Sequence, residues 1–559
     1  MLLLRPRSFS PATLAVAVLI ILSLYFFSYR FGPDSSSLRQ ELADSIQKNL
    51  QEIEGNKKPQ DAVEVPPLPP TEEEAVIPTP PSSFVPTTLQ RIQIPPPSTP
   101  TDDIKSTPTP PSYELSPLPS DYHLDPHETS EDKKWCETRY GPTYLETIAK
   151  NARPYCTPES TSQFDCMHSV MLGENRLDST CLAHNIAFDE NKFNIDCQLR
   201  DWATEPDLKG IPRYNTLPDY WYTTGPRNII TQFVNFGPSG APAIERNACN
   251  DPSTPRDDGY KVLIKREGGI NYWHSLMEIF SFYFTIDALQ MAINQKTGKP
   301  YMSPEDLAKI QVIILDKHDN KNYFELWNFF AVDNPVLTLP EFAAKDTTKK
   351  CISNIILPLP GGSNPLWQGD WDPRNCDQSL IVETLRTRVL NHLHVPQSRD
   401  LKAPLNLTFI DRKGTRKLRD TADLTDALKK EYPDVNINVV DMAKLSLREQ
   451  LAIIVQTDVL VGVHGAGHTH GFFLPKQSSV VEILPPDLKH KGFRNLAALR
   501  GLRYFSDHGQ FAPKEKAPGS GGRDWHEEDI VVEKAAFMKL VDAAVQSVRH
   551  RGFLDKDVS

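Results

Sequence analysis

Two arginines carry the clearest chemistry in the sequence. Arg412 and Arg416 lie four residues apart and straddle Gly414, directly after the apolar run Leu405–Ile410. Guanidinium groups bind phosphate oxygens in pairs and stay charged at neutral pH. The spacing therefore favours a diphosphate ligand, although a solvated basic loop gives the same pattern when it is considered alone.

A glycine-rich turn follows a second predicted strand. The apolar run Asp458–Val463 has the length of a strand, and His464, Gly465, Ala466 and Gly467 come directly after it. Glycines let a ligand approach the backbone closely, and their N–H groups ahead of a short helix can bind an anion. The spacing is not the dinucleotide fingerprint GxGxxG, and the turn comes late in its domain, so we do not expect NAD.

A carboxylate is expected at the same edge of the predicted sheet. Glu482 lies near the end of the apolar run Ser478–Leu484. In a doubly wound α/β sheet, ligands bind outside the carboxyl ends of the strands, where His464 and Glu482 would both point. Glu482 could accept the two hydroxyls of a ribose, and a salt-bridged surface carboxylate is the structural alternative. His468 and His470 lack HExxH spacing, so we predict no metal site here.

A second titratable group lies at the start of a long helix predicted over Ile270–Asn294. His274 is near its first turn and Glu278 is one turn further on. A histidine at a helix N-terminus with a carboxylate at i+4 fits a general base or a phosphate contact. A hydrogen-bonded histidine beside a Tyr and Trp core is the alternative. Asp370-Trp371-Asp372 matches the DxD pattern of metal-bound diphosphate sites, but its Gly and Pro neighbours favour a turn.

The elements that must position these residues alternate between strands and helices in two regions. Over 260–392, three runs of strand length alternate with two helical patterns, which predicts a parallel, Rossmann-like domain. Over 405–548, the order β-α-β-α-β-α-β predicts a second one. The predicted fold class is therefore α/β, with an N-terminal domain over 131–395 and a C-terminal domain over 396–559. A chain of 559 residues is long enough for both.

The N-terminal part of the chain differs from these regions in composition. Residues 12–29 are apolar and uncharged, and Arg5 and Arg7 precede them. We therefore predict a transmembrane anchor with residues 1–11 in the cytoplasm, although a cleaved signal peptide is the alternative. Residues 30–130 are predicted to form a stem. It would begin with a short helix whose apolar stripe could support a homodimer, and continue as a disordered Pro-rich linker.

The charge and the cysteines limit the class of protein. A formal net charge of -11, with no basic patch interleaved with aromatic residues, argues against a nucleic-acid partner. All eight cysteines follow the Pro-rich linker, where a luminal head would meet an oxidising environment. Their spacing does not suit zinc, so disulfides are expected, in an irregular lead-in over Cys136–Trp221. The sequon at Asn406 lies in a predicted core strand and is expected to stay unmodified.

Three stretches of the chain resemble motifs of glycosyltransferase family 61, which includes EGF-domain O-GlcNAc transferases and plant xylosyltransferases. They occur in the family's order, as Asn271–Phe280 (NYWHSLMEIF), Phe409–Arg416 (FIDRKGTR) and Val461–Ile483 (VGVHGAGHTHGFFLPKQSSVVEI). One residue departs from the pattern, because His468 stands where the family usually has an aliphatic side chain.

The resemblance implies a GT-B architecture, in which two Rossmann-like domains face a cleft and the C-terminal one holds a UDP-sugar. Arg412 and Arg416 would grip the diphosphate, the turn His464–Gly467 would flank it, and Glu482 would hold the ribose. The reaction would be an inverting transfer of GlcNAc or xylose to a hydroxyl of a protein or glycan acceptor.

The resemblance also implies where the base lies. The candidates are His274 and Glu278, with Asp316 behind them. Such enzymes stabilise the departing diphosphate with arginines and helix dipoles, so no cofactor or metal is expected to be required. The expected location is the Golgi membrane, or the ER membrane, with the head in the lumen. A membrane-tethered carbohydrate-binding protein without catalytic activity is the alternative function.

Overall fold

The computed structural model describes residues 115–122 and 131–551, apart from 170–176, 190, 238–248, 250, 252, 269–270, 321–322, 332, 346–349, 401–402 and 514–523. The described residues fall in one of the two compact units of the chain, Asp103–Ser559. The predicted cytoplasmic tail, membrane anchor and stem helix lie outside the described residues. Within that part of the chain, no helix is long and apolar enough to cross a membrane.

The first half of the described chain is built on a mixed sheet. In the described residues this sheet has nine strands, seven of them in the order β1-β2-β3-β11-β6-β9-β10, with β4 paired to β3 and to β5. The strands are β1 (Arg153–Pro154), β2 (Gln163–His168), β3 (Ser179–Asp189), β4 (Lys192–Asp196), β5 (Val234–Gly237), β6 (Arg256–Ile264), β9 (Ile310–Ile314), β10 (Leu337–Thr338) and β11 (Lys350–Leu357). Strand β6 pairs in parallel with β9 and β11, so the three predicted parallel strands are confirmed.

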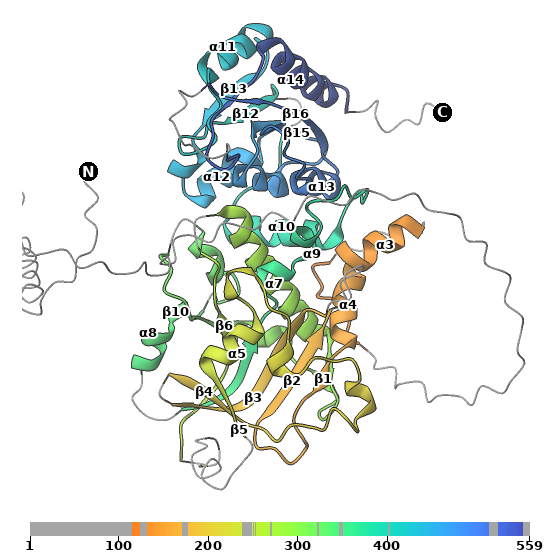
Figure 1. Cartoon of the computed structure of the whole chain (residues 1–559), viewed down its shortest axis with the longest axis vertical. Helices are drawn as coiled ribbons and strands as arrows, with labels where there is room; N and C mark the ends of the chain where they lie inside the picture. The colour runs from red at the N-terminus through yellow and green to blue at the C-terminus, as the bar shows by residue number, and fades with distance from the viewer. Residues whose placement is uncertain are drawn as a thin grey trace, which may run out of the picture. The chain divides into compact units, whose positions relative to one another are not determined.

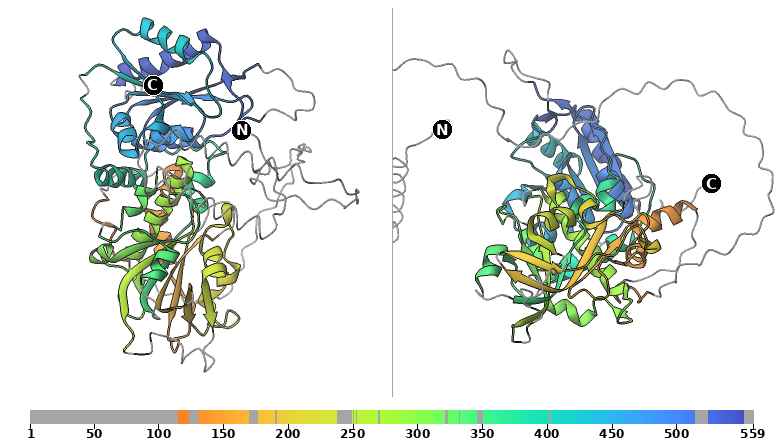
Figure 2. Two further views of the ribbon diagram at one scale, coloured as in Figure 1. Left: turned by 90° about the vertical axis from the view of Figure 1, so that its left-hand side faces the viewer. Right: turned by 60° about the horizontal axis from the view of Figure 1, so that its bottom comes forward.

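The prediction that Cys136–Trp221 is irregular is wrong. Strands β2 and β3 form a regular antiparallel pair, and β3 also pairs antiparallel with β11, so the first sheet is mixed (Figure 2). The sequence of β3 lacks a clear strand pattern because it carries polar side chains that bond across the sheet. Thr180 donates to the carbonyl of Leu357 at 2.9 Å, and Nδ1 of His184 lies 2.6 Å from Oδ1 of Asn354.

The helices of this half pack on the mixed sheet and beside it. They are α3 (Glu131–Tyr140), α4 (Pro142–Lys150), α5 (Pro226–Phe233), α7 (Tyr272–Met291), α8 (Leu339–Ala344), α9 (Pro365–Gln368) and α10 (Leu380–His392), with short 3-10 turns including η3 (Trp221–Thr223), η5 (Pro304–Lys309), η6 (Phe324–Asn328) and η7 (Gly361–Ser363). Helix α7 is buried on almost every side, which explains why its sequence is apolar all round. The Asn271 side chain caps it by accepting from the backbone N–H groups of Trp273 and His274.

The second half of the described chain matches the predicted topology closely. Its described strands form a five-stranded parallel sheet in the order β13-β12-β14-β15-β16. The elements are β12 (Asn406–Ile410), α11 (Thr421–Glu431), β13 (Asn436–Val440), α12 (Leu447–Ile454), β14 (Val459–Val463), η9 (Ala466–Phe473), β15 (Ser479–Leu484), α13 (Gly492–Leu499), β16 (Arg503–His508), β18 (Ile530–Val531) and α14 (Lys534–Arg549). Helix α13 and strand β16 were not predicted. Helix α14, the last helix of this half, begins at Lys534 because the Glu533 side chain caps it.

The two faces of the five-stranded sheet are buried against different helices. Figure 1 shows α11 and α14 on one side of the sheet and α12 and α13 on the other. Val459 and Val461 pack in a core cluster with α11 and α14, whereas Leu460 and Val480 pack in the cluster that holds α12 and α13. Alternate side chains of a strand point to opposite faces, so both faces are apolar. The second cluster also contains most of α7 and therefore connects the two halves.

All eight cysteines lie in the described part of the chain, and all are paired. The disulfides are Cys136–Cys376, Cys156–Cys197, Cys166–Cys181 and Cys249–Cys351. The predicted use of the cysteines is confirmed. Disulfides of this number indicate that the head folds in an oxidising compartment of the secretory pathway.

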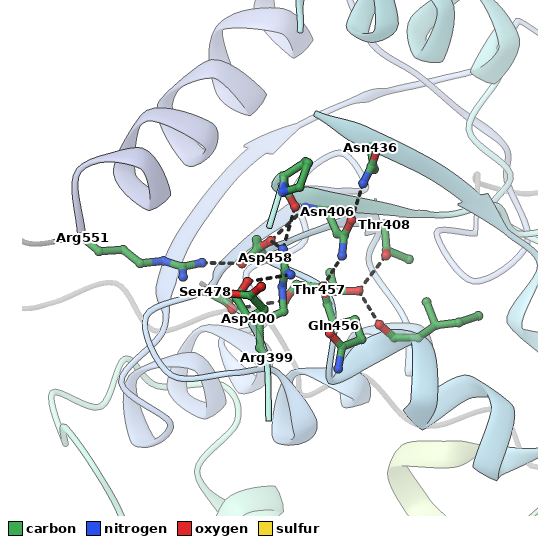
Figure 3. A network of polar contacts seen from close by, with 12 residues as sticks. Arg399, Asp400, Asn406, Thr408, Asn436, Gln456, Thr457, Asp458, Ser478 and Arg551 are labelled. Carbon is green, nitrogen blue, oxygen red and sulfur yellow. Dashed lines mark hydrogen bonds and ion pairs between the residues drawn. The ribbon is translucent and has the colours of Figure 1, made fainter. Parts of the chain in front are cut away.

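The polar network in Figure 3 holds the beginning of strand β14. One carboxylate oxygen of the buried Asp458 lies 2.8 Å from Nη2 of Arg399 and accepts from the backbone N–H of Asn406 at 2.8 Å. Its other oxygen lies 2.5 Å from Nη2 of Arg551, which follows α14. Asp458 therefore ties the segment before β12 and the end of α14 to the base of the sheet.

A segment that was predicted to be disordered linker packs on the head. Residues 115–122 belong to the predicted stem, yet Tyr122 is buried and its hydroxyl donates to Oδ2 of Asp287 at 2.6 Å. Arg388 from α10 binds Asp287 at 2.9 Å and also Asp121 at 2.6 Å. The last part of the Pro-rich stretch is ordered because it supplies a partner for a buried carboxylate of α7.

Tyr122→Phe should lower the free energy of unfolding of the full chain by about 1–3 kcal/mol, since it removes a hydrogen bond to a buried carboxylate. Thermal unfolding followed by circular dichroism measures the effect. Asp121→Asn changes only the exposed partner of Arg388 and should cost less than about 1 kcal/mol. Equal losses in the two variants would show that Tyr122 is not an anchoring residue.

Candidate functional site

The predicted arginine pair converges with the glycine-rich turn. A Cβ atom added to Gly465 would lie 2.6 Å from Nη1 of Arg412 and 3.3 Å from Nη2 of Arg416. Both guanidinium groups therefore meet at the backbone that follows β14. Gly465 has a φ of 147°, which side-chain-bearing residues rarely adopt, so both its conformation and its contacts require glycine here.

The two arginines differ from the other cations of the same loop in forming no ion pair with a carboxylate among the described residues. The other three cations of the loop form ion pairs with carboxylates; they are Lys413, Lys417 and Arg419. In the described residues, neither Arg412 nor Arg416 has such an ion pair, and Nε of Arg416 is buried without a hydrogen-bond partner. Burial and the adjacent Arg412 lower the pKa of Arg416 to about 10, against the opposing effect of the more distant carboxylates of Glu527 and Asp524. Two partly buried, adjacent cations without a carboxylate favour binding of an anion with several oxygens.

His464 and Glu482 form a buried pair behind this cation site. Nδ1 of His464 lies 2.6 Å from Oε1 of Glu482, and the Tyr504 hydroxyl donates to the other carboxylate oxygen at 2.5 Å. Burial alone would raise the pKa of Glu482, but His464, His468 and Tyr504 together lower it to about 2. Burial lowers the pKa of His464 to about 4. At neutral pH the pair is therefore a neutral imidazole that donates to a carboxylate.

Several aromatic and polar residues around the pair were not predicted. The Trp525 ring lies 5.6 Å from His464 and 5.3 Å from the Arg416 guanidinium. The His490 ring lies 4.9 Å from His464, and its Nε2 lies 3.2 Å from Oδ2 of Asp370. The turn predicted around Asp370 is confirmed. No local pattern in the sequence joins Trp525, His490 and Asp370, because they come from three separate loops.

The two other histidines of the turn are buried in the fold. His468, the departure from the family pattern, hydrogen-bonds through Nε2 to the carbonyl of Gly462 at 3.1 Å. In His470, Nδ1 lies 2.8 Å from the carbonyl oxygen of Gly467 and Nε2 lies 2.9 Å from Oε1 of Gln450. Burial lowers the pKa of His470 to about 4, because it outweighs the favourable carbonyl contact. In the described residues, no three His, Cys, Asp or Glu side chains are arranged to hold a metal ion.

A neutral, buried His470 should make the protein less stable in acid. Its pKa lies below that of an unfolded histidine, so between about pH 6.5 and 4 the unfolded state binds a proton that the folded state does not. Stability is therefore lost as the pH falls through that window, by about 1.4 kcal/mol per pH unit for this group. His470→Gln should flatten the pH dependence of the free energy of unfolding, measured by urea titration, by that amount. A steeper dependence in His470→Gln would mean that His470 is charged in the fold.

The predicted base candidates lie near the start of α7. Nδ1 of His274 lies 3.1 Å from Oε2 of Glu267, a residue that was not predicted, rather than beside Glu278. Oε1 of Glu278 instead accepts from the backbone N–H of Glu267 at 2.8 Å. Asp316 is fully engaged, because both of its oxygens bind the Arg266 guanidinium. Of the three candidates, His274 is the one with an exposed edge, at 20% of its side-chain surface.

Helix α7 brings this group to the second sheet through aromatic contacts. The Trp273 ring lies 5.4 Å from Phe493 of α13, and Phe280 lies 4.9 Å from Phe472 of η9. Asp370 is close enough to His274 to raise its pKa against the effect of burial, and it also contacts His490. The structure therefore links the His274 group to the His464 group through Asp370 and His490.

Comparison with known proteins identifies the class of enzyme. The sequence profile described as Glycosyltransferase 61 matches residues 272–481, which hold α7, the arginine loop and the glycine-rich turn. Over these residues the chain is a distant homologue of glycosyltransferase family 61. It is thus an enzyme that transfers a sugar from a donor to an acceptor. The predicted resemblance is confirmed.

Several relatives of the chain are named transferases. The chain is 24% identical to the EGF domain-specific O-linked N-acetylglucosamine transferase of Drosophila melanogaster over 438 residues, which are 73% of this chain and 76% of that protein. It is 26% identical to the mouse (Mus musculus) protein of the same name over 397 residues, 68% of this chain and 69% of the other. The rat (Rattus norvegicus) protein is 24% identical over 391 residues, with the same coverage.

Proposed function

We propose that this family 61 enzyme is an inverting glycosyltransferase that transfers GlcNAc or xylose from a UDP-sugar to a hydroxyl of a protein or glycan. The observation that carries the proposal is the pair Arg412 and Arg416, two cations that meet at Gly465 and are without an acidic partner among the described residues. A nucleoside diphosphate supplies the charge and the oxygens that such a pair binds.

The donor would lie along the carboxyl ends of β12, β14 and β15. Arg412 and Arg416 would hold the diphosphate, and the backbone of His464, Gly465, Ala466 and Gly467 would flank it. Glu482 remains our proposal for the ribose, but both of its oxygens already accept hydrogen bonds, from His464 and Tyr504. Each carboxylate oxygen has a second lone pair, which is the acceptor that a ribose hydroxyl would use.

The base would come from the first half of the chain. We propose His274, whose partly exposed imidazole can accept the proton of the acceptor hydroxyl. The GT-B arrangement, a Golgi location and a membrane anchor over residues 12–29 belong to the same proposal. The four disulfides support a luminal head.

A panel of UDP-sugars tests the proposal on the full chain. Calorimetry should detect binding of UDP, and hydrolysis assays with water as the acceptor should release UDP from UDP-GlcNAc or UDP-xylose. Activity is expected to persist in EDTA, because the arginines stabilise the departing diphosphate. A protein that binds no UDP and turns over no UDP-sugar would contradict the proposal.

A further inference from the structure

We infer that Glu267 is the positioning residue for the base His274, an inference that rests on the proposed function. Nδ1 of His274 lies 3.1 Å from Oε2 of Glu267. The two groups are close but are not aligned for a linear hydrogen bond. Such bonds are often poorly aligned in a free enzyme and tighten when the substrate binds.

The place of Glu267 is determined by three elements. It follows strand β6, its backbone N–H donates to Glu278 on α7, and its side chain is 2% exposed. A Cβ atom on Gly361 of η7 would lie 3.3 Å from Oε1 of Glu267 and 2.8 Å from Cγ of Glu278. A side chain at position 361 would therefore crowd the side chains of both Glu267 and Glu278. Oε1 of Glu267 has no hydrogen-bond partner among the described residues, so the carboxyl group is not engaged in a structural network.

The side chains of Glu267 and Glu278 are two neighbouring buried carboxyl groups. Burial raises the pKa of both Glu267 and Glu278, and the charge of Glu267 raises that of Glu278 further. Arg266 is the adjacent cation, but Asp316 already neutralises it. Since two buried carboxylates side by side cannot both be charged, at least one of the two groups holds a proton. We assign this proton to the wholly buried Glu278, which leaves Glu267 as the anion facing His274.

His274 is held so that its other ring nitrogen stays available. The Trp367 ring lies 4.4 Å from the imidazole and the Tyr222 ring 5.5 Å from it. In the described residues, no side chain or backbone group hydrogen-bonds to Nε2. An Nδ1–H that points to Glu267 leaves the lone pair of the imidazole on Nε2, as a base requires. The other titratable or charged groups around the ring are Tyr222 on η3, Asp370 after α9, Glu278 on α7, and the Arg266–Asp316 pair.

The transfer step moves one proton and exchanges one bond at the anomeric carbon. Nε2 takes the proton of the acceptor hydroxyl while that oxygen forms a bond to the anomeric carbon. The bond from the anomeric carbon to UDP breaks, and its electron pair leaves on the diphosphate, next to Arg412 and Arg416. The imidazolium that forms is paired with the Glu267 carboxylate. Burial lowers the pKa of His274 to about 4, so the ring needs this anion to be an effective base.

Glu267→Gln in the full chain tests the inference, with UDP-sugar hydrolysis and UDP binding as readouts. We expect kcat to fall about 10- to 100-fold, the Kd for UDP to stay within about twofold of wild type, and the acidic limb of the pH profile to move to lower pH. The limb moves because a neutral amide no longer favours the imidazolium. Glu267→Asp should recover part of the rate. Glu278→Gln should leave the limb in place, since an amide there replaces a group that is already neutral.

The outcomes separate the inference from the proposed function. If wild type binds no UDP and hydrolyses no UDP-sugar, the proposed function fails. If wild type is active and Glu267→Gln keeps its rate and its acidic limb, or loses UDP binding and activity together, the positioning role is overturned. Should the variant not fold, ¹⁵N-histidine spectra of wild type decide. Assigned through His274→Gln, His274 is expected as the Nδ1–H tautomer, and an Nε2–H tautomer would contradict the inference.

Discussion

Replacing both Arg412 and Arg416 with alanine should abolish measurable UDP binding and UDP-sugar turnover together. Each charge-assisted contact to a diphosphate contributes about 1.5–3 kcal/mol, so each single variant should weaken UDP binding roughly 10- to 100-fold. The fold-loss of UDP affinity in the double variant should be about the product of the fold-losses in the two single variants. The double variant should still fold, because neither guanidinium forms an ion pair in the described structure and so no carboxylate would be left unpaired. Isothermal titration calorimetry with UDP measures the effect.

Lys413→Ala is the matched control for the arginine variants. Lys413 lies on the same loop and carries the same charge, but it is exposed and paired with Asp411 at 2.5 Å. Its loss should change UDP affinity less than about threefold, because an exposed cation interacts weakly through solvent. If Lys413→Ala and Arg412→Ala weaken binding equally, the loop acts only through its overall charge, and the specific diphosphate site is wrong.

Asp458→Ala should lower the free energy of unfolding by about 3–5 kcal/mol, because it leaves two arginines without their buried counter-charge. Asp458 is buried and binds Arg399, Arg551 and the backbone of Asn406 (Figure 3). The urea midpoint, followed by tryptophan fluorescence, should fall accordingly. UDP affinity measured below the transition should change little, since Asp458 lies at the opposite end of β14 from His464.

Asp434→Ala provides the comparison for Asp458→Ala. It also removes an aspartate bound to an arginine of the C-terminal domain, here Arg549 at 2.7 Å, but Asp434 is 67% exposed. An exposed pair contributes at most about 1 kcal/mol. The prediction is contradicted if the two variants have the same urea midpoint.

The regular part of the second sheet was predictable because its signals are local. Strands β12, β14 and β15 are largely apolar, as expected of parallel strands buried on both faces, whereas the edge strand β13 is mostly exposed. The capping box of Ser446 and Glu449 marks the start of α12 and is confirmed. The same local logic found Arg412, Arg416 and Gly465, since the carboxyl ends of neighbouring parallel strands meet at one edge of a sheet. It failed for β3, whose polar side chains find their partners on other strands.

The sequence by itself determined the α/β class, the parallel strands, the use of the cysteines and the family, because each depends on residues close together in the chain or on a motif. Only the tertiary structure decided which groups meet. Glu267 rather than Glu278 contacts His274, Asp316 is committed to Arg266, and Asp370 contacts His490. The physical reason is that a protonation state or a hydrogen bond depends on burial and on distances of a few ångströms. Loops that are distant in sequence set those distances, and no periodic pattern records them.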